Sequence, residues 1–154
     1  MKLEVEQILC ATDFSDSAAH AFQYALAIAA HHGASVELLH VAECSIYANG
    51  PPLKREESGG TFEDRLRERL DEIAASQSVD VPIETTVVNG VPSVEIVKHA
   101  EASSADLIVL GTHGRTGLKH LLVGSVAEKV IRSAACPVCT VRYPDLKTNT
   151  SKEA

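Results

Sequence analysis

Four glycines lie close together in the segment GTHGRTGLKHLLVGS, which covers residues 111–125. They are Gly111, Gly114, Gly117 and Gly124, and Ser125 directly follows the last of them. Glycine is unfavourable in ordered backbone unless its torsional freedom or its missing side chain is needed. Such a cluster is typical either of a mobile surface connection or of a loop whose backbone approaches a ligand. The apolar run DLIVL before it and the helical pattern after it favour the second interpretation.

The chemistry that suits this segment is the binding of phosphate groups. A helix N-terminus offers unpaired N–H groups and the positive end of the helix dipole to an anion. Ser125 would add a hydroxyl donor at that point, and Gly124 would let an oxygen approach without meeting a Cβ atom. Arg115 either reaches a phosphate or is a solvated loop arginine, and the sequence does not choose between the two.

A second candidate is Asp13, which follows the strand-like run ILCAT. Its carboxylate could accept a hydrogen bond from a ribose hydroxyl or help to hold a metal ion. Aspartate is equally common at turns that lead into a helix, so both interpretations stay open. His113 and His120 also fall near the glycine segment, and we interpret them as loop residues rather than general bases. There is no H-E-x-x-H, and we expect no metal cluster.

Phosphate donors beside an acceptor for a ribose hydroxyl would suit a nucleotide. The sequence, however, lacks the groups that fast nucleotide hydrolysis needs. It contains no G-x-x-x-x-G-K-(S/T) loop and no clear nucleophile–base pair, so we predict no catalytic residues and at most slow ATP hydrolysis. Cys136 and Cys139 spell C-x-x-C, which is compatible with a redox or zinc site. A strand-like pattern follows Cys136, whereas a redox motif normally opens a helix, so we interpret these cysteines as small buried hydrophobes.

Composition narrows the possible partners. The chain has 154 residues, of which 45% are hydrophobic and 23% charged, as in ordinary globular proteins, and its net charge is −7. This negative charge argues against binding of nucleic acid or an anionic membrane, both of which need a basic face. No run of apolar residues is long enough to span a membrane, and the start MKLEVEQILCATD does not resemble a signal peptide, so we expect a cytoplasmic protein.

The candidate residues need a framework, and hydrophobic periodicity predicts one in which strands and helices alternate. A segment with few apolar residues and several Gly and Pro, residues 42–60, is expected to be a long loop. In the helices we expect Phe62, Leu66, Leu70 and Ile73 to share one face, and Val94 to point inward. The expected strands are 4–12, 35–41, 81–88, 106–110 and 137–141, and the expected helices are 17–32, 62–77, 93–104 and 125–134.

This alternation predicts an α/β fold whose parallel sheet is covered by helices on both faces. In such sheets ligands bind beyond the carboxyl ends of the strands, where the strand order reverses. If the first and fourth strands are neighbours, Asp13 and the glycine segment share one crevice. Periodicity alone does not fix the strand order.

The pattern Gly111-x2-Gly114-x9-Gly124-Ser125 resembles the G-2x-G-9x-G-(S/T) signature of the universal stress protein family, in its nucleotide-binding branch. The runs ILCATDFSDSA and NGVPSVEIV are also similar to that family. The resemblance implies a Rossmann-like three-layer sandwich, related to the adenine nucleotide alpha hydrolases, with a five-stranded parallel sheet of order 3-2-1-4-5. It also implies a homodimer paired through the last strand, Pro137 to Arg142.

The same resemblance assigns roles to residues. Asp13 would contact the ribose or adenine region, and the backbone at Val41 would receive adenine. Gly111 and Gly114 would line the ribose and phosphates, and Gly124 with Ser125 would bind the terminal phosphates beside the Val126 amide. Ala11 and Thr12, which stand where many members carry Val-Pro or a similar pair, and Arg115 complete the predicted nucleotide-binding residues.

The function that the resemblance implies is that of an ATP-binding regulatory module in a stress response, with a regulatory protein as its unknown partner. ATP, or else ADP or AMP, would bring Mg²⁺ through its phosphates. The alternatives are a slow Mg²⁺-dependent ATPase or nucleotide hydrolase, an AMP-binding protein, and a ligand-free scaffold for a partner. We expect one domain over residues 1–144 and a polar, disordered tail over residues 145–154.

Overall fold

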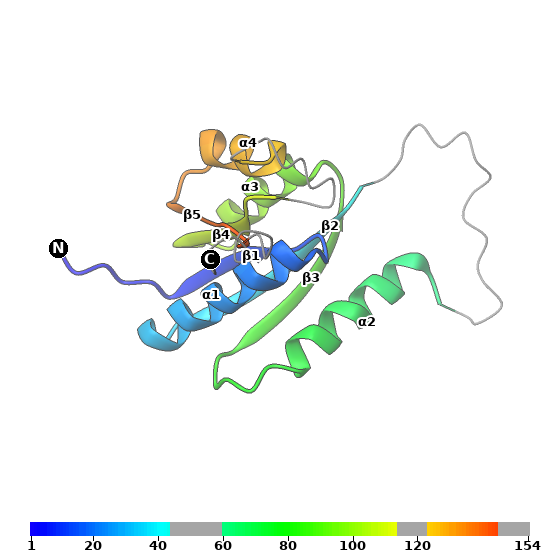
Figure 1. The fold of residues 1–154 in the computed structure, drawn as a ribbon, viewed down its shortest axis with the longest axis horizontal. Coiled ribbons are helices and arrows are strands. Elements are labelled where there is room, and N and C mark those ends of the chain that lie inside the picture. Colours follow the sequence, from blue (N-terminus) through cyan, green and yellow to red (C-terminus); the bar gives the residue numbers. More distant parts are fainter. Residues whose placement is uncertain (44–59, 114–122, 145–154) are drawn as a thin grey trace, which may run out of the picture.

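Nine elements alternate strictly between strand and helix in the computed structural model, which describes residues 1–43, 60–113 and 123–144 (Figure 1). The expected loop over residues 42–60, apart from its ends, and the expected tail over residues 145–154 lie outside the described residues. The strands are β1 (Gln7–Ala11), β2 (Ser35–Ala42), β3 (Ile83–Asn89), β4 (Leu107–Gly111) and β5 (Val138–Val141). The helices are α1 (Asp16–His32), α2 (Phe62–Ala75), α3 (Pro92–Ala102) and α4 (Ser125–Ser133).

The five strands form one parallel sheet in the order β3-β2-β1-β4-β5, which confirms the predicted fold class and strand order. The first strand is central: Cys10 pairs with Leu38 of β2 on one side and with Val109 of β4 on the other. The middle residues of β1 and β4 are all buried, as expected for strands that are covered on both faces. The reversal of strand order therefore lies between β1 and β4.

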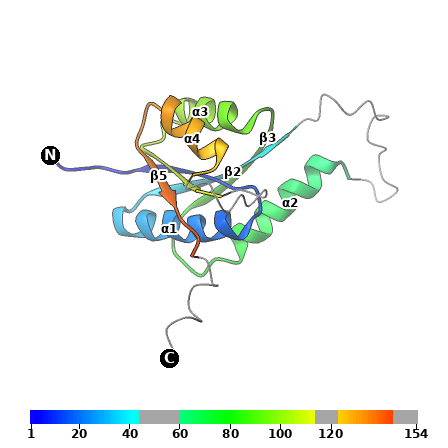
Figure 2. The same cartoon turned by 45° about the horizontal axis from the view of Figure 1, so that its top comes forward.

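Helices cover both faces of this sheet and make three layers (Figures 1 and 2). One apolar core lies between the sheet and helices α1 and α2, and it includes Phe22, Leu26 and Leu70. A second core lies between the sheet and helices α3 and α4, and it includes Ile96 and Val130. Successive side chains of each strand point alternately into these two cores, so residues two apart on a strand face the same helix layer.

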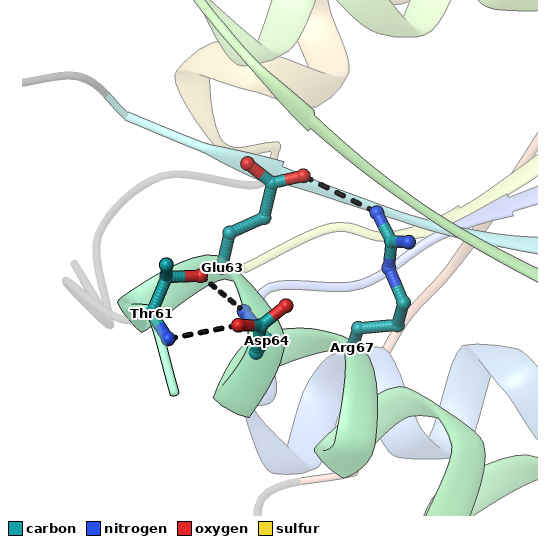
Figure 3. A network of polar contacts seen from close by, with 4 residues as sticks. All are labelled: Thr61, Glu63, Asp64 and Arg67. Carbon is teal, nitrogen blue, oxygen red and sulfur yellow. Dashed lines mark hydrogen bonds and ion pairs between the residues drawn. The ribbon is translucent and has the colours of Figure 1, made fainter. Parts of the chain in front are cut away.

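Helix ends follow the local signals in the sequence. The Ser15 side chain caps α1 by accepting a hydrogen bond from the Ala18 amide, and Gly33 ends the helix with a left-handed φ of 71°. At the start of α2, Thr61 Oγ1 accepts from the Asp64 amide at 3.1 Å, and Asp64 Oδ2 accepts from the Thr61 amide at 2.8 Å (Figure 3). The hydrogen bonds from Thr61 lower the pKa of the Asp64 carboxyl below its ordinary value. One turn on, Arg67 pairs with Glu63 on the exposed surface (Figure 3).

Some element ends differ from the expected ones because side chains take the hydrogen bonds. The first strand begins at Gln7 rather than residue 4, since the Asp106 carboxylate accepts from the amides of Glu6 and Gln7 at 2.9 and 3.0 Å. Helix α2 ends at Ala75 rather than residue 77, where the side chains of Ser76 and Gln77 both donate to the Ile73 carbonyl.

Two apolar side chains do not lie where periodicity placed them. Phe62 and Val94 were expected to face inward, yet they are 52% and 49% exposed. Phe62 is the first residue of α2, one turn before the half-buried Leu66, so it stands at the exposed end of its apolar stripe. In α3 the buried residues are Ser93, Ile96 and Ala100, so Val94 lies beside the buried face rather than on it. In the described parts of the chain, no helix is long and apolar enough to cross a membrane.

Candidate functional site

The strand order brings the predicted ligand residues to one edge of the sheet. Because β1 lies between β2 and β4, the carboxyl ends of these three strands, Ala11, Ala42 and Gly111, meet at the same edge. Thr12 and Asp13 continue directly from β1 at this edge. β1 and β4 are therefore neighbours in the sheet. This was the condition under which Asp13 and the glycine segment would share one crevice. Gly114 and Arg115 lie outside the described residues.

The chain after β1 is fixed by a series of short-range and long-range hydrogen bonds. The Thr12 amide donates to the Leu39 carbonyl at 2.8 Å, so Thr12 extends the pairing with β2 by one residue. The Phe14 amide then donates to Thr12 Oγ1 at 3.1 Å, and the Ser15 amide donates to Asp13 Oδ1 at 3.0 Å. Asp13 therefore has the turn role that was one of its two interpretations. A carboxylate can accept several hydrogen bonds, so this role does not preclude a ligand.

Val41 reaches the same edge from β2. It pairs in parallel with Val88 of β3, and its side chain is 8% exposed and packs into the core under α3 and α4. The backbone of Val41, rather than its side chain, is thus the part suited to an adenine ring.

Gly111 has a packing reason to be glycine. A Cβ atom at this position would overlap Ser17 Oγ and would lie 3.0 Å from the Ser17 carbonyl oxygen. The first turn of α1 therefore rests directly on the last residue of β4. Sequence reasoning assigned Gly111 to a ligand, whereas this contact with α1 explains the glycine without one.

A backbone hydrogen bond joins Thr112, directly after β4, to Gly124, directly before α4. The Gly124 amide donates to the Thr112 carbonyl at 2.5 Å, and the Thr112 amide donates to the Val141 carbonyl at 3.1 Å. Thr112 is buried, and its hydroxyl lies 2.9 Å from His113 Nδ1. Sequence reasoning missed Thr112, because nothing in its local sequence marks this long-range role.

Gly124 is the N-cap of α4, with φ −68° and ψ 162°, a conformation that any residue adopts. Its carbonyl accepts the first helical hydrogen bond, from the Glu128 amide at 3.0 Å. The amides of Ser125, Val126 and Ala127 precede that bond and have no partner inside the helix. Among the described residues, no side chain caps this end of α4. The sequence predicted phosphate binding at Gly124, Ser125 and the Val126 amide of this helix start, and this role stays a prediction.

The cysteines do not form a shared site. Cys136 packs against the core under α3 and α4, whereas Cys139 packs against the core under α1 and α2. The two sulfur atoms thus lie on opposite faces of the sheet, and both residues are half-buried rather than buried as expected. Burial raises the pKa of the Cys136 thiol, and it raises that of Cys10 to about 12. Within the described ranges, no group of three His, Cys, Asp or Glu residues is placed to hold a metal ion.

This arrangement can be compared with that of known proteins. The model of the universal stress protein family matches residues 4–142 of the chain. The chain belongs to the universal stress protein family.

Its relatives agree with this membership. The universal stress protein MJ0531 of Methanocaldococcus jannaschii is 38% identical over 144 residues, which cover 90% of this chain and 83% of the relative. The structure of the universal stress protein UspA from Lactobacillus plantarum is similar with a TM-score of 0.72 and 28% identity, over 92% of this chain and 100% of the other. A universal stress protein in complex with cAMP is similar with a TM-score of 0.66 and 25% identity, over 90% and 98% of the two chains.

The universal stress protein fold accounts for the position of the candidate site. In this family member the acidic residue after β1, the backbone at the end of β2 and the start of α4 come from three separate stretches of sequence. The parallel sheet alone brings them to one edge.

Proposed function

We propose that this universal stress protein binds ATP and acts as a nucleotide-dependent regulatory module. The observation that carries the proposal is the shared sheet edge, where Asp13 follows β1 and the first-turn amides of α4 follow the segment after β4. A relative of the same fold is described in complex with cAMP, which supports an adenine nucleotide as the ligand class.

The residues at this edge suit the three parts of the nucleotide. Adenine would lie against the backbone of Val41 and beside Ala11 and Thr12, and Asp13 would accept a ribose hydroxyl. The phosphates would accept hydrogen bonds from the Ser125 hydroxyl and from the amides of Ser125 and Val126, favoured by the helix dipole. Mg²⁺ would be carried by the phosphate oxygens. Binding at backbone donors does not need a basic protein, so it is compatible with a net charge of −7.

The test begins with the purified protein as it comes from the cell. We expect acid denaturation to release an adenine nucleotide, identified by chromatography and mass spectrometry. Protein freed of nucleotide should then bind ATP–Mg²⁺ in calorimetric titrations, with AMP, ADP, cAMP and GTP as comparisons. A chain that releases nothing and gives no heat with any adenine nucleotide would refute the proposal. ATP hydrolysis is measured on the same samples against a control without protein.

We also propose a homodimer that pairs through β5. Among the described strands, β5 is an edge of the sheet, next to β4 alone. The backbone groups on its outer side have no strand partner in the described part of the chain, and they offer a template for a second copy of the same strand. A regulatory partner would then meet two nucleotide sites in one assembly.

A further inference from the structure

Phe14 has an unusual backbone conformation at the proposed site. Its φ is 65°, in the left-handed region that non-glycine residues seldom adopt. The residue stands between Asp13 and Ser15, the N-cap of α1. Such strain persists only where surrounding contacts fix it. The contacts that fix Phe14 are therefore also contacts that determine where Asp13 lies.

His40 supplies the first of these contacts. It comes from β2, within the apolar run SVELLHV, and is only 8% exposed. Its Nδ1 lies 2.8 Å from the Thr12 carbonyl oxygen, and because a carbonyl only accepts, Nδ1 carries the hydrogen and donates. The imidazole ring also packs on the Phe14 ring, with centroids 4.5 Å apart. One side chain thus contacts the residues on both sides of Asp13.

Arg69 supplies the second contact, from helix α2. Its guanidinium carbon lies 4.1 Å from the centroid of the Phe14 ring, within the range of a cation–π interaction. The sequence separation between Phe14 and Arg69 is large, so this contact links the residue after β1 to a helix of another crossover. Arg69 is exposed, which makes it suitable for substitution.

We infer that His40 and Arg69 are positioning residues for Asp13, acting through Thr12 and Phe14. Neither needs to touch the nucleotide. His40 fixes the peptide that follows β1, and the ring of Phe14, packed against His40 and Arg69, keeps the left-handed turn that places the Asp13 carboxylate at the sheet edge. The inference rests on the proposed nucleotide site for its functional part, whereas its structural part can be tested without any ligand.

Two substitutions of His40 separate the hydrogen bond from the ring. His40→Phe keeps an aromatic ring and loses the donor, whereas His40→Asn keeps a donor near the position of Nδ1 and loses the ring. Arg69→Met keeps the length of the side chain and loses the charge. Arg67→Met is the matched control, because Arg67 lies on the same helix and pairs with Glu63.

The first measurement is amide hydrogen exchange by NMR on nucleotide-free protein. In His40→Phe we expect the Phe14 and Ser15 amides to exchange about tenfold faster, the scale of one lost hydrogen bond. His40→Asn should restore most of this protection, and Arg69→Met should give a smaller increase at the same two amides. Unchanged exchange at both amides in His40→Phe and Arg69→Met would overturn the inference. So would an equal increase throughout the sheet, which would indicate a general loss of stability.

The second measurement is ATP–Mg²⁺ affinity by calorimetry. We expect His40→Phe to weaken binding about tenfold, again the scale of one hydrogen bond, and Arg67→Met to leave it unchanged. Combining His40→Phe with Asp13→Ala should weaken binding no further than Asp13→Ala alone, because both act through the same carboxylate. Additive losses would overturn the role of His40 through Asp13. If the wild-type protein binds no nucleotide, the proposed function fails, and the exchange measurement still decides whether His40 and Arg69 fix the turn.

Discussion

Gly111 and Gly124 belong to one sequence motif, yet the structure gives them different surroundings. Gly111 is in contact with Ser17, where a Cβ atom would overlap the serine side chain. Gly124 has an ordinary extended conformation at the start of α4. The first glycine therefore contributes to stability through packing, and the second is the one whose missing side chain would matter to a ligand.

A substitution at Gly111 tests the packing role. We expect Gly111→Ala to lower the free energy of unfolding by roughly 1–3 kcal/mol, as overpacked core positions do. Adding Ser17→Ala to Gly111→Ala should recover part of this loss, because the double variant lacks the hydroxyl nearest the new methyl group. Ser17 Oγ is also buried with no hydrogen-bond partner among the described residues, so Ser17→Ala alone should not destabilise the protein. Urea unfolding of the three variants measures these values, and a stable Gly111→Ala protein would contradict the account.

Substitutions at the start of α4 test the phosphate role. Gly124→Val should place a branched side chain where phosphate oxygens belong and abolish ATP binding, while the protein keeps its fold. Ser125→Ala should weaken ATP binding by roughly 1–2 kcal/mol, the scale of one hydrogen bond to a charged group. Calorimetry gives the affinities, and circular dichroism gives the fold. Wild-type affinity in both variants would mean that the phosphates bind elsewhere.

At the scale of elements, a polar cluster around the buried Glu37 joins β2, β3 and α3. Glu37 of β2 is 5% exposed, and its Oε1 accepts from Thr86 Oγ1 of β3 at 2.7 Å and from His99 Nε2 of α3 at 2.6 Å. A buried carboxylate is costly unless such donors surround it. The cluster therefore links helix α3 to β2 and β3 through directional hydrogen bonds, which an apolar side chain at position 37 could not make.

Removing one member of this cluster should be more harmful than removing two. We expect His99→Leu to destabilise the protein by about 3 kcal/mol, because it leaves Glu37 buried with Thr86 as its one donor among the described residues. The double variant Glu37→Leu with His99→Leu should be more stable than His99→Leu alone. Lys98→Ala, next to His99, breaks only the exposed pair with Glu95 and should cost less than about 1 kcal/mol. Thermal and urea unfolding provide the comparison, and equal losses in His99→Leu and Lys98→Ala would contradict it.

The elements themselves were largely predictable from the sequence, because periodicity, Ser15, Gly33 and Thr61 are local signals. The strand order came from the resemblance to a family, since alternation of strands and helices fits several orders. Contacts between distant segments could not be predicted. The Gly111–Ser17 contact and the bond from His40 to Thr12 exist only after the sheet has formed, so no local pattern marks them. Phe62 was misplaced because a helical stripe does not show where the core beneath it ends. Val94 was misplaced because the buried face of α3 includes the polar Ser93, which hydrophobic periodicity does not mark.

At the scale of the whole molecule, the proposed homodimer depends on the outer edge of β5. The Pro137 carbonyl accepts from the Ile108 amide of β4, and the Val141 carbonyl accepts from the Thr112 amide directly after β4. Backbone groups alternate in direction along a strand, so the amides and carbonyls of Val138 and Thr140 point away from β4. These are the groups that a second copy of the chain would use.

A proline at this edge tests the proposed homodimer. Thr140→Pro removes an outward amide and leaves the ladder to β4 intact, so we expect a folded chain that no longer forms dimers. Thr140→Val keeps the amide and is the matched control, which should remain dimeric. Light scattering after size exclusion, over a range of concentrations, gives the mass in solution. A Thr140→Pro protein that stays dimeric would show that any dimer uses another surface.

The placement of Cys136 and Cys139 has a practical consequence for following motion in this protein. Because the two thiols face different helix layers, a fluorophore or spin label on one of them would monitor α3 and α4, and on the other α1 and α2. Variants that each retain one of these thiols would show whether ATP is sensed on one side of the sheet or on both.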